Sequence, residues 1–119
     1  MNLQHIIDQL NLIVLTEPRD FANITAAGGY SSDLLSCVLA GAKKGFIWIT
    51  LQAHLNIVAV AALTEVAAVI ITENTQPDAA SIAKANQQGV ILFSTSQPTY
   101  EVNGKLWEMG IHNGMPIER

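Results

Sequence analysis

Three short runs of apolar and β-branched residues, each followed by a helical pattern, constrain the fold of this chain more than any other feature. The runs cover residues 46–51, 67–72 and 90–93. They are apolar on both faces, as expected of strands that lie between two layers of helices. Successive strand–helix units of similar length bring their strands parallel through right-handed crossovers. The sequence therefore predicts an α/β fold, with a mostly parallel open sheet and helices on both faces.

Local signals place the helices that follow these runs. Prolines and small polar residues open them and a glycine closes one, as is typical of helix ends. The predicted helices begin at His54 or Asn56, at Pro77 with Asp78, and at Pro98, and the first two end at about Thr64 and before Gly89.

The first third of the chain has a less regular pattern. The spacing of its apolar residues predicts a helix over 3–10 and a strand over 12–15, and the polar residues 16–23 predict a loop. Gly28 and Gly29 then mark a place where the backbone must bend or approach another group closely.

A further helix is expected from Ser32 to Gly41, capped by Ser31 or Ser32, with Asp33 in its first turn. Four of its residues are more apolar than one core face requires: Leu34, Leu35, Val38 and Leu39. Cys37, in the same pattern, is expected to be buried. Because only 13% of the chain is charged while 50% is hydrophobic, much of its surface is uncharged, which favours self-association. We expect a homodimer that uses this helix as its contact.

The length of 119 residues suits one domain, which we place at residues 1–111, followed by a loosely held C-terminal tail at 112–119. The net charge of −4 argues against a nucleic-acid partner. No apolar run reaches the roughly 18 residues that would indicate a membrane span. The single cysteine excludes an internal disulfide and is typical of a cytoplasmic protein. No motif indicates a metal or another cofactor.

Candidate functional residues lie where the predicted strands end, because ligands of open parallel sheets bind outside the carboxyl ends of the strands. These ends carry hydroxyl and amide groups and few charged ones. Such a lining suits a small polar or anionic effector, such as a nucleotide. The candidates, together with the glycine-led segment before the helix at 32–41, are Gly29, Ser32, Asp33, Thr50, Gln52, His54, Asn56, Thr72, Glu73, Asn74, Ser94 and Thr95.

Two other interpretations of these residues remain open. Serine, threonine and asparagine also cap helices, so the same side chains can serve the fold alone. Alternatively, His54 is the base of an enzyme, oriented by Asp33 or Glu73, although no nucleophile motif accompanies it.

Two segments carry a resemblance to a known family. Residues 29–36 read GYSSDLLS, and residues 48–61 read WITLQAHLNIVAVA. Both resemble the DRTGG domain family, and more closely its small stand-alone members related to the N-terminal domain of HPr serine kinase. The similarity runs from the first helix to about Ile111. The chain departs from the pattern that gives the family its name, because TLQAH at 50–54 and TEN at 72–74 replace its glycine and arginine positions.

The resemblance implies an α/β fold like the HPr kinase N-terminal domain, without a phosphate loop or catalytic domain. Related domains occur beside CBS domains in regulated pyrophosphatases, where they look like regulatory or oligomerisation parts. We therefore expect a non-catalytic regulatory module that binds a metabolite or a partner protein. The alternatives are a structural subunit of a larger redox or phosphotransfer complex, and the His54 enzyme.

Overall fold

The computed structural model describes residues 1–113, and it confirms the α/β class predicted from the sequence. Its strands form one five-stranded sheet in the order β1-β5-β4-β3-β2. The strands are β1 (Ile13–Val14), β2 (Gly28–Ser31), β3 (Phe46–Thr50), β4 (Ala68–Ile71) and β5 (Leu92–Ser94). The pairs β2–β3, β3–β4 and β4–β5 are parallel, whereas β1 lies antiparallel to β5 at one edge.

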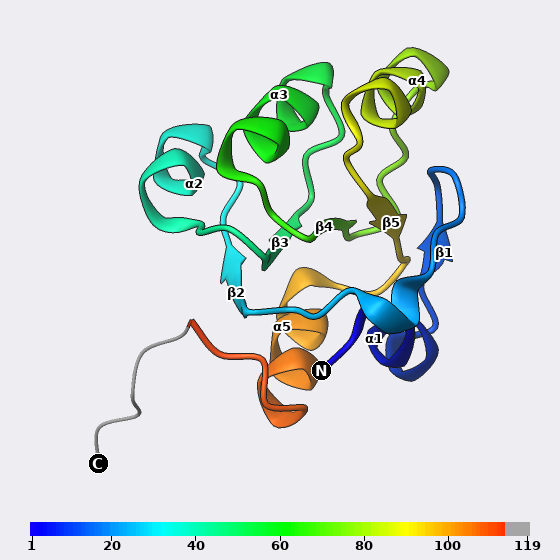
Figure 1. The fold of residues 1–119 in the computed structure, drawn as a ribbon. Coiled ribbons are helices and arrows are strands. Elements are labelled where there is room, and N and C mark those ends of the chain that lie inside the picture. Colours follow the sequence, from blue (N-terminus) through cyan, green and yellow to red (C-terminus); the bar gives the residue numbers. More distant parts are fainter. Residues whose placement is uncertain (114–119) are drawn as a thin grey trace.

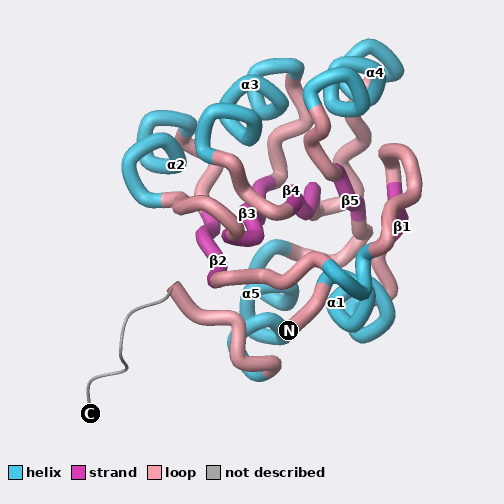
Figure 2. The backbone as a smooth tube through the Cα atoms, in the orientation of Figure 1, coloured by secondary structure: helices cyan, strands magenta, loops and turns pink. Residues whose placement is uncertain are grey.

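Helices cover both faces of this sheet, as expected (Figure 1). They are α1 (Leu3–Leu10), α2 (Leu35–Gly41), α3 (Leu55–Thr64), α4 (Ala79–Gln88) and α5 (Thr99–Glu108), with a short 3-10 helix η1 (Phe21–Asn23). Figures 1 and 2 show α2, α3 and α4 side by side over one face, and α1 and α5 over the other. The described chain is therefore a three-layer α/β structure.

Two apolar clusters, one on each face, hold the three layers together. Alternate residues of β3 divide between them, since Ile47 and Ile49 pack toward α1 and α5 while Trp48 packs toward α2 and α3. All five residues of β3 and all four of β4 are buried. This burial explains why the central strands are continuous apolar runs in the sequence, without the alternation of a half-exposed strand.

The segment before α2 differs from the prediction. Gly28–Ser31 forms β2, which pairs along its length with β3, and α2 begins at Leu35 with Leu34 as its N-cap. Asp33 therefore lies before the helix rather than in its first turn. The backbone N–H of Ser32 donates to the carbonyl of Ile49, so the sheet ladder extends past Ser31 and delays the helix.

One further expectation is corrected. Cys37 is exposed on α2, because the buried side of that short helix is occupied by Val38. In the segment after α5, Ile111 is buried and the carbonyl of His112 accepts a hydrogen bond from Gly29 N at 2.8 Å. The predicted tail beyond Asn113 lies outside the described residues.

Candidate functional site

The carboxyl ends of the three central strands meet at one edge of the sheet. The N–H of Thr72 donates to the carbonyl of Thr50 at 2.9 Å, and the N–H of Thr95 donates to that of Ile71, also at 2.9 Å. The juxtaposition expected from parallel strands is therefore present. All three threonines are buried, however, so their hydroxyls face the protein rather than solvent.

Each of these hydroxyls already has a partner within the chain. Thr50 Oγ1 donates to Asp33 Oδ1 at 2.8 Å, and Thr95 Oγ1 accepts from the backbone N–H of Gln97 at 3.1 Å. Thr72 Oγ1 shares a hydrogen bond with Thr99 Oγ1 at the start of α5. These contacts tie the loops to the strand ends, which is the capping role left open by the sequence.

The two acidic candidates are likewise engaged in the fold. Asp33 Oδ1 also accepts the backbone N–H of Leu51 at 2.9 Å, so one carboxylate oxygen anchors the end of β3. Glu73 Oε2 accepts the N–H of Thr99 at 2.7 Å and so caps α5. Glu73 and Asn74 both adopt left-handed backbone angles, with φ of 61° and 58°, and their N–H groups donate to Gln97 and Thr95 carbonyls.

Next to this edge lies an open pocket of about 540 Å³ between the loops that lead into α3 and α4. Its polar lining combines Gln52 and His54 from one loop with Thr75, Gln76 and Asp78 from the other. His54 is the N-cap residue of α3, but its side chain forms no capping bond. A small polar ligand could therefore be met by imidazole, amide and hydroxyl groups in one place.

Asp78 supplies the carboxylate of this pocket. It caps α4 by accepting the N–H of Ser81 at 2.8 Å, and this hydrogen bond holds the pKa of Asp78 below its ordinary value. The nearby His54 side chain also acts to lower this pKa, by less than the hydrogen bonding to Ser81 does. Among the described lining residues, no lysine or arginine contributes.

The other sequence candidates lie elsewhere. Asn56 lines a groove between α3 and α4, and Gly29 lines a pocket beside α5. Ser32 Oγ accepts the N–H of Leu34 at 3.1 Å, while Ser94 Oγ is buried and has no hydrogen-bond partner in the described chain. The twelve candidates therefore do not form one site.

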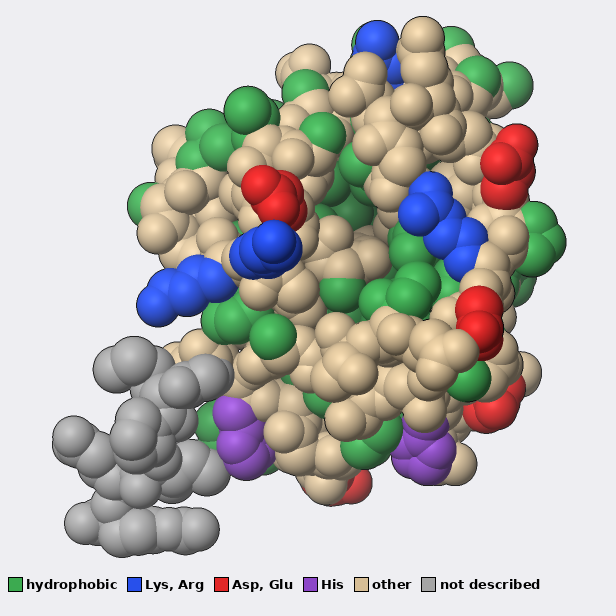
Figure 3. Space-filling model, viewed as in Figure 1, with side chains coloured by type: hydrophobic (Ala, Val, Ile, Leu, Met, Phe, Trp, Pro, Cys, Tyr) green, Lys and Arg blue, Asp and Glu red, His purple; other side chains and the backbone are tan. Residues whose placement is uncertain are grey.

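The set of twelve candidates leaves out Thr75 and Gln76, which line the pocket that contains His54. They directly follow Asn74, so extending the strand exit by two residues would have included them. The described chain holds no group of three or more histidine, cysteine or acidic side chains arranged for a metal. Figure 3 shows the few charged side chains of the visible face lying scattered among uncharged atoms.

The chain is thus a three-layer α/β domain with a polar, nearly uncharged pocket beside the carboxyl edge of its sheet. No protein-family model matches it, and neither does any curated protein. Among solved structures, it is similar to the CBS and DRTGG domains of the regulatory region of Clostridium perfringens pyrophosphatase, a structure complexed with the activator diadenosine tetraphosphate. The TM-score is 0.67 at 14% sequence identity, over 95% of this chain and 48% of the other.

This likeness supports a DRTGG-like domain, in agreement with the sequence, and at this identity it is the fold that is shared. The chain spans about half the length of the regulatory region it matches. Within the part of the chain that the structure describes, no helix has the length and apolar character needed to cross a bilayer.

Proposed function

We propose that this protein is a regulatory, non-catalytic module that senses a small polar or anionic metabolite and works as a homodimer. The observation that carries the sensing role is the pocket of Gln52, His54, Thr75, Gln76 and Asp78. Its groups converge from two helix-opening loops, at the edge where open parallel sheets bind ligands.

The hydrogen bonding of the acidic residues favours sensing over catalysis. A catalytic histidine needs an orienting partner, and Asp33 and Glu73 were the candidates. Asp33 is held by Thr50 and Leu51, and Glu73 by Thr99. No hydrogen bond in the described chain joins either carboxylate to His54. The similar pyrophosphatase region is regulatory and is complexed with an activator, which supports the same class of role here.

A thermal-shift titration tests the sensing role. Free ligand that binds only the folded protein adds RT ln(1 + [L]/Kd) to stability, so binding raises the melting temperature. The probes are ribose, an uncharged polar ligand, and ribose 5-phosphate and inorganic phosphate, which are anionic; none of them carries an aromatic base. We expect at least one to raise the melting temperature of the wild type, and His54→Ala to abolish the rise. His5→Ala changes an exposed histidine on α1 and serves as the control. A His54→Ala protein with an unchanged ligand shift would contradict this site.

The dimer is supported by the outer surfaces of α2 and α3, which lie side by side (Figure 1). Neither helix contains a charged residue. The two helices and the N-cap of α2 also expose large apolar side chains: Leu34 (61%), Leu39 (50%), Leu55 (50%) and Leu63 (76%). Beside this surface, a mostly apolar groove of about 440 Å³ continues from α3 to α4, where Lys84 and Gln88 line it.

A second copy of the chain suits this surface for an electrostatic reason. With a net charge of −4, two copies repel each other in general. A two-fold interface places the same patch on both subunits, so a charge-free patch avoids like-charge contacts there. Covering the four leucines also removes apolar area from water.

Sedimentation velocity at about 50 µM measures the oligomeric state. The wild type should sediment as a dimer, and Leu39→Glu with Leu63→Glu should give a folded monomer. Tyr100→Glu is the matched control, because Tyr100 is 88% exposed on α5 in the opposite layer. A monomeric wild type would remove the homodimer and instead favour the alternative in which this face docks onto another protein.

A further inference from the structure

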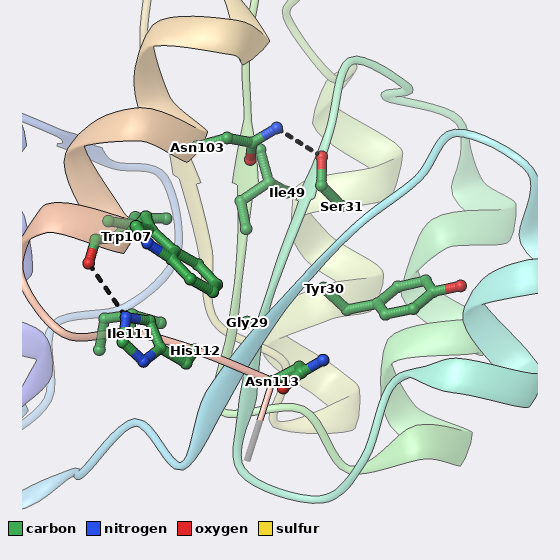
Figure 4. Close-up of a pocket in the computed structure, with 10 residues that line it drawn as sticks. Gly29, Tyr30, Ser31, Ile49, Asn103, Trp107, Ile111, His112 and Asn113 are labelled. Atoms are coloured by element: carbon green, nitrogen blue, oxygen red, sulfur yellow. Dashed lines mark hydrogen bonds between the residues drawn. The ribbon is translucent and has the colours of Figure 1, made fainter. Parts of the chain in front are cut away.

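A second pocket, of about 170 Å³, lies on the opposite side of the sheet from α3 and α4 (Figure 4). It is bounded by the edge strand β2, by α5 and by the segment that follows α5. None of its described lining residues is lysine, arginine, aspartate or glutamate. The pocket is therefore suited to an uncharged group rather than to a phosphate.

Two glycines allow this pocket to form. Gly29 N donates to the carbonyl of His112 at 2.8 Å, which fixes the segment after α5 against the outer edge of β2. A Cβ at Gly28 would lie 2.5 Å from that same carbonyl oxygen, so only glycine permits the approach. The close approach expected from the glycine pair is thus observed, and it builds one wall of the pocket.

The second wall is an aromatic surface. Trp107 projects from α5 toward β2 (Figure 4), and its side chain is 53% exposed. The His112 ring lies against it at a tilt, with a centroid distance of 3.9 Å and an interplanar angle of 35°. Buried Ile49, Leu106 and Ile111 supply the apolar floor. A half-exposed indole held in place above an apolar floor is a platform for another planar ring.

Polar groups stand at the rim of this platform. Asn103 Nδ2 donates to Ser31 Oγ at 3.0 Å, joining α5 to β2 across the pocket (Figure 4). With Ser31 Oγ acting as acceptor, the Ser31 O–H and the Asn103 Oδ1 have no partner within the described chain. One donor and one acceptor therefore lie side by side, as a ring with an acceptor next to a donor requires.

We propose that this pocket binds one planar, uncharged heteroaromatic ring that carries a hydrogen-bond acceptor beside a donor, the chemistry of a nucleobase. The ring contacts Trp107 and the apolar floor, and its polar edge pairs with Ser31 and Asn103. The pocket volume of about 170 Å³ agrees with one bound ring, because a cavity of about 150 Å³ holds benzene. This site is separate from the pocket at His54, and the inference does not rest on the proposed sensing there.

NMR titration of the full chain tests the site. The chain has two tryptophans, and Trp48 is fully buried with its Nε1 bonded to the Ser32 carbonyl, so its indole signal is an internal reference. Adenosine and uridine are the probes, and ribose 5-phosphate is the control ligand, because it carries no base. We expect both nucleosides to shift the Trp107 indole and Asn103 amide signals saturably, while Trp48 stays fixed and ribose 5-phosphate has no effect.

Variants separate stacking from edge recognition. Truncation of a stacking aromatic costs roughly tenfold or more in affinity, so Trp107→Ala should weaken nucleoside binding by that factor. Asn103→Leu keeps the floor but removes the amide, and should weaken binding about fivefold. Tyr100→Ala removes an exposed aromatic from the same helix and should leave the affinity unchanged.

Three results would overturn the proposal. These are the absence of a saturable Trp107 shift with either nucleoside, equal shifts with ribose 5-phosphate, and unchanged affinity in a Trp107→Ala protein that melts like the wild type. Because Trp107 is half exposed, its truncation is expected to leave the protein folded. A loss of nucleoside binding on His54→Ala would instead place the ring in the other pocket.

Discussion

Replacing Asp33 by alanine tests whether this carboxylate holds the fold together or is free for another role. One oxygen of Asp33 accepts from Thr50 Oγ1 at 2.8 Å and from Leu51 N at 2.9 Å. Thr50 is fully buried, so Asp33→Ala leaves its hydroxyl without this acceptor and away from water. Leu51 is 41% exposed, so its N–H can turn to solvent at little cost.

The magnitude follows from these two exposures. An unsatisfied buried polar group costs about 1–3 kcal/mol, so Asp33→Ala should lower the free energy of unfolding by about 2 kcal/mol. In a domain of this size each kcal/mol shifts the melting temperature by about 4 °C, which gives a fall of about 8 °C. Asp33→Asn keeps an acceptor oxygen and should lose about half as much.

Urea unfolding followed by circular dichroism measures these changes. Asp8→Ala, an exposed aspartate on α1, is the control and should stay within about 0.5 kcal/mol of the wild type. Thr50→Val completes a double-mutant cycle, in which the two substitutions should couple by about 1 kcal/mol. Additive effects, or a cost of Asp33→Ala below about 0.5 kcal/mol, would refute the anchoring role and leave the carboxylate available to His54.

Four further substitutions have expected outcomes of their own. Gly28→Ala should lower the free energy of unfolding by about 2 kcal/mol in urea titrations, because its Cβ would overlap the His112 carbonyl. Gly104→Ala adds a Cβ that meets nothing within 4 Å and should raise the free energy of unfolding by about 0.5–1 kcal/mol. If Gly104→Ala destabilised the protein as much as Gly28→Ala, the steric argument would be contradicted. Asp78→Asn tests a pH dependence: the folded-state pKa of Asp78 is depressed, so its contribution to stability is complete above its ordinary pKa and disappears as pH falls through the lower folded value. The gap in melting temperature between wild type and Asp78→Asn should therefore narrow from about pH 5 to about pH 2, and a gap that widens would show the sign to be wrong. Ser94→Ala removes a buried hydroxyl that has no partner in the described chain, so calorimetry should show an unchanged or higher melting temperature, and a marked fall would mean that Ser94 Oγ is bonded in solution.

Three of the strands predicted from the sequence, β3, β4 and β5, are buried on both faces, whereas β1 was predicted from a short apolar run and is partly exposed. Burial by helices on each side demands apolar residues at every position of β3 and β4, and such runs are visible without knowing their partners. β2 carries no such signal, since Gly28–Ser31 contains one large side chain, Tyr30, and no β-branched residue. It becomes a strand because it pairs with β3, with Tyr30 opposite Trp48.

The candidate site was predictable in position but not in composition. The rule for parallel strands correctly gathers Thr50, Thr72 and Thr95 at one edge. Which polar groups there remain available depends on partners that local patterns do not show. The Asp33–Thr50 bond spans 17 residues and the Glu73–Thr99 bond spans 26, and both use groups that the sequence left free for a ligand.

The sequence by itself determined the α/β class, the parallel direction of the central strands and the edge at which their polar residues gather. These follow from the spacing of apolar residues and from helix-end signals, which act over a few residues. Only the tertiary structure decided which hydroxyls and carboxylates are consumed by the fold, and it alone made the pocket in which Ser31 meets Asn103, 72 residues away. A hydrogen bond or a cavity depends on which surfaces come within a few ångströms of each other, and that is set by how the layers pack.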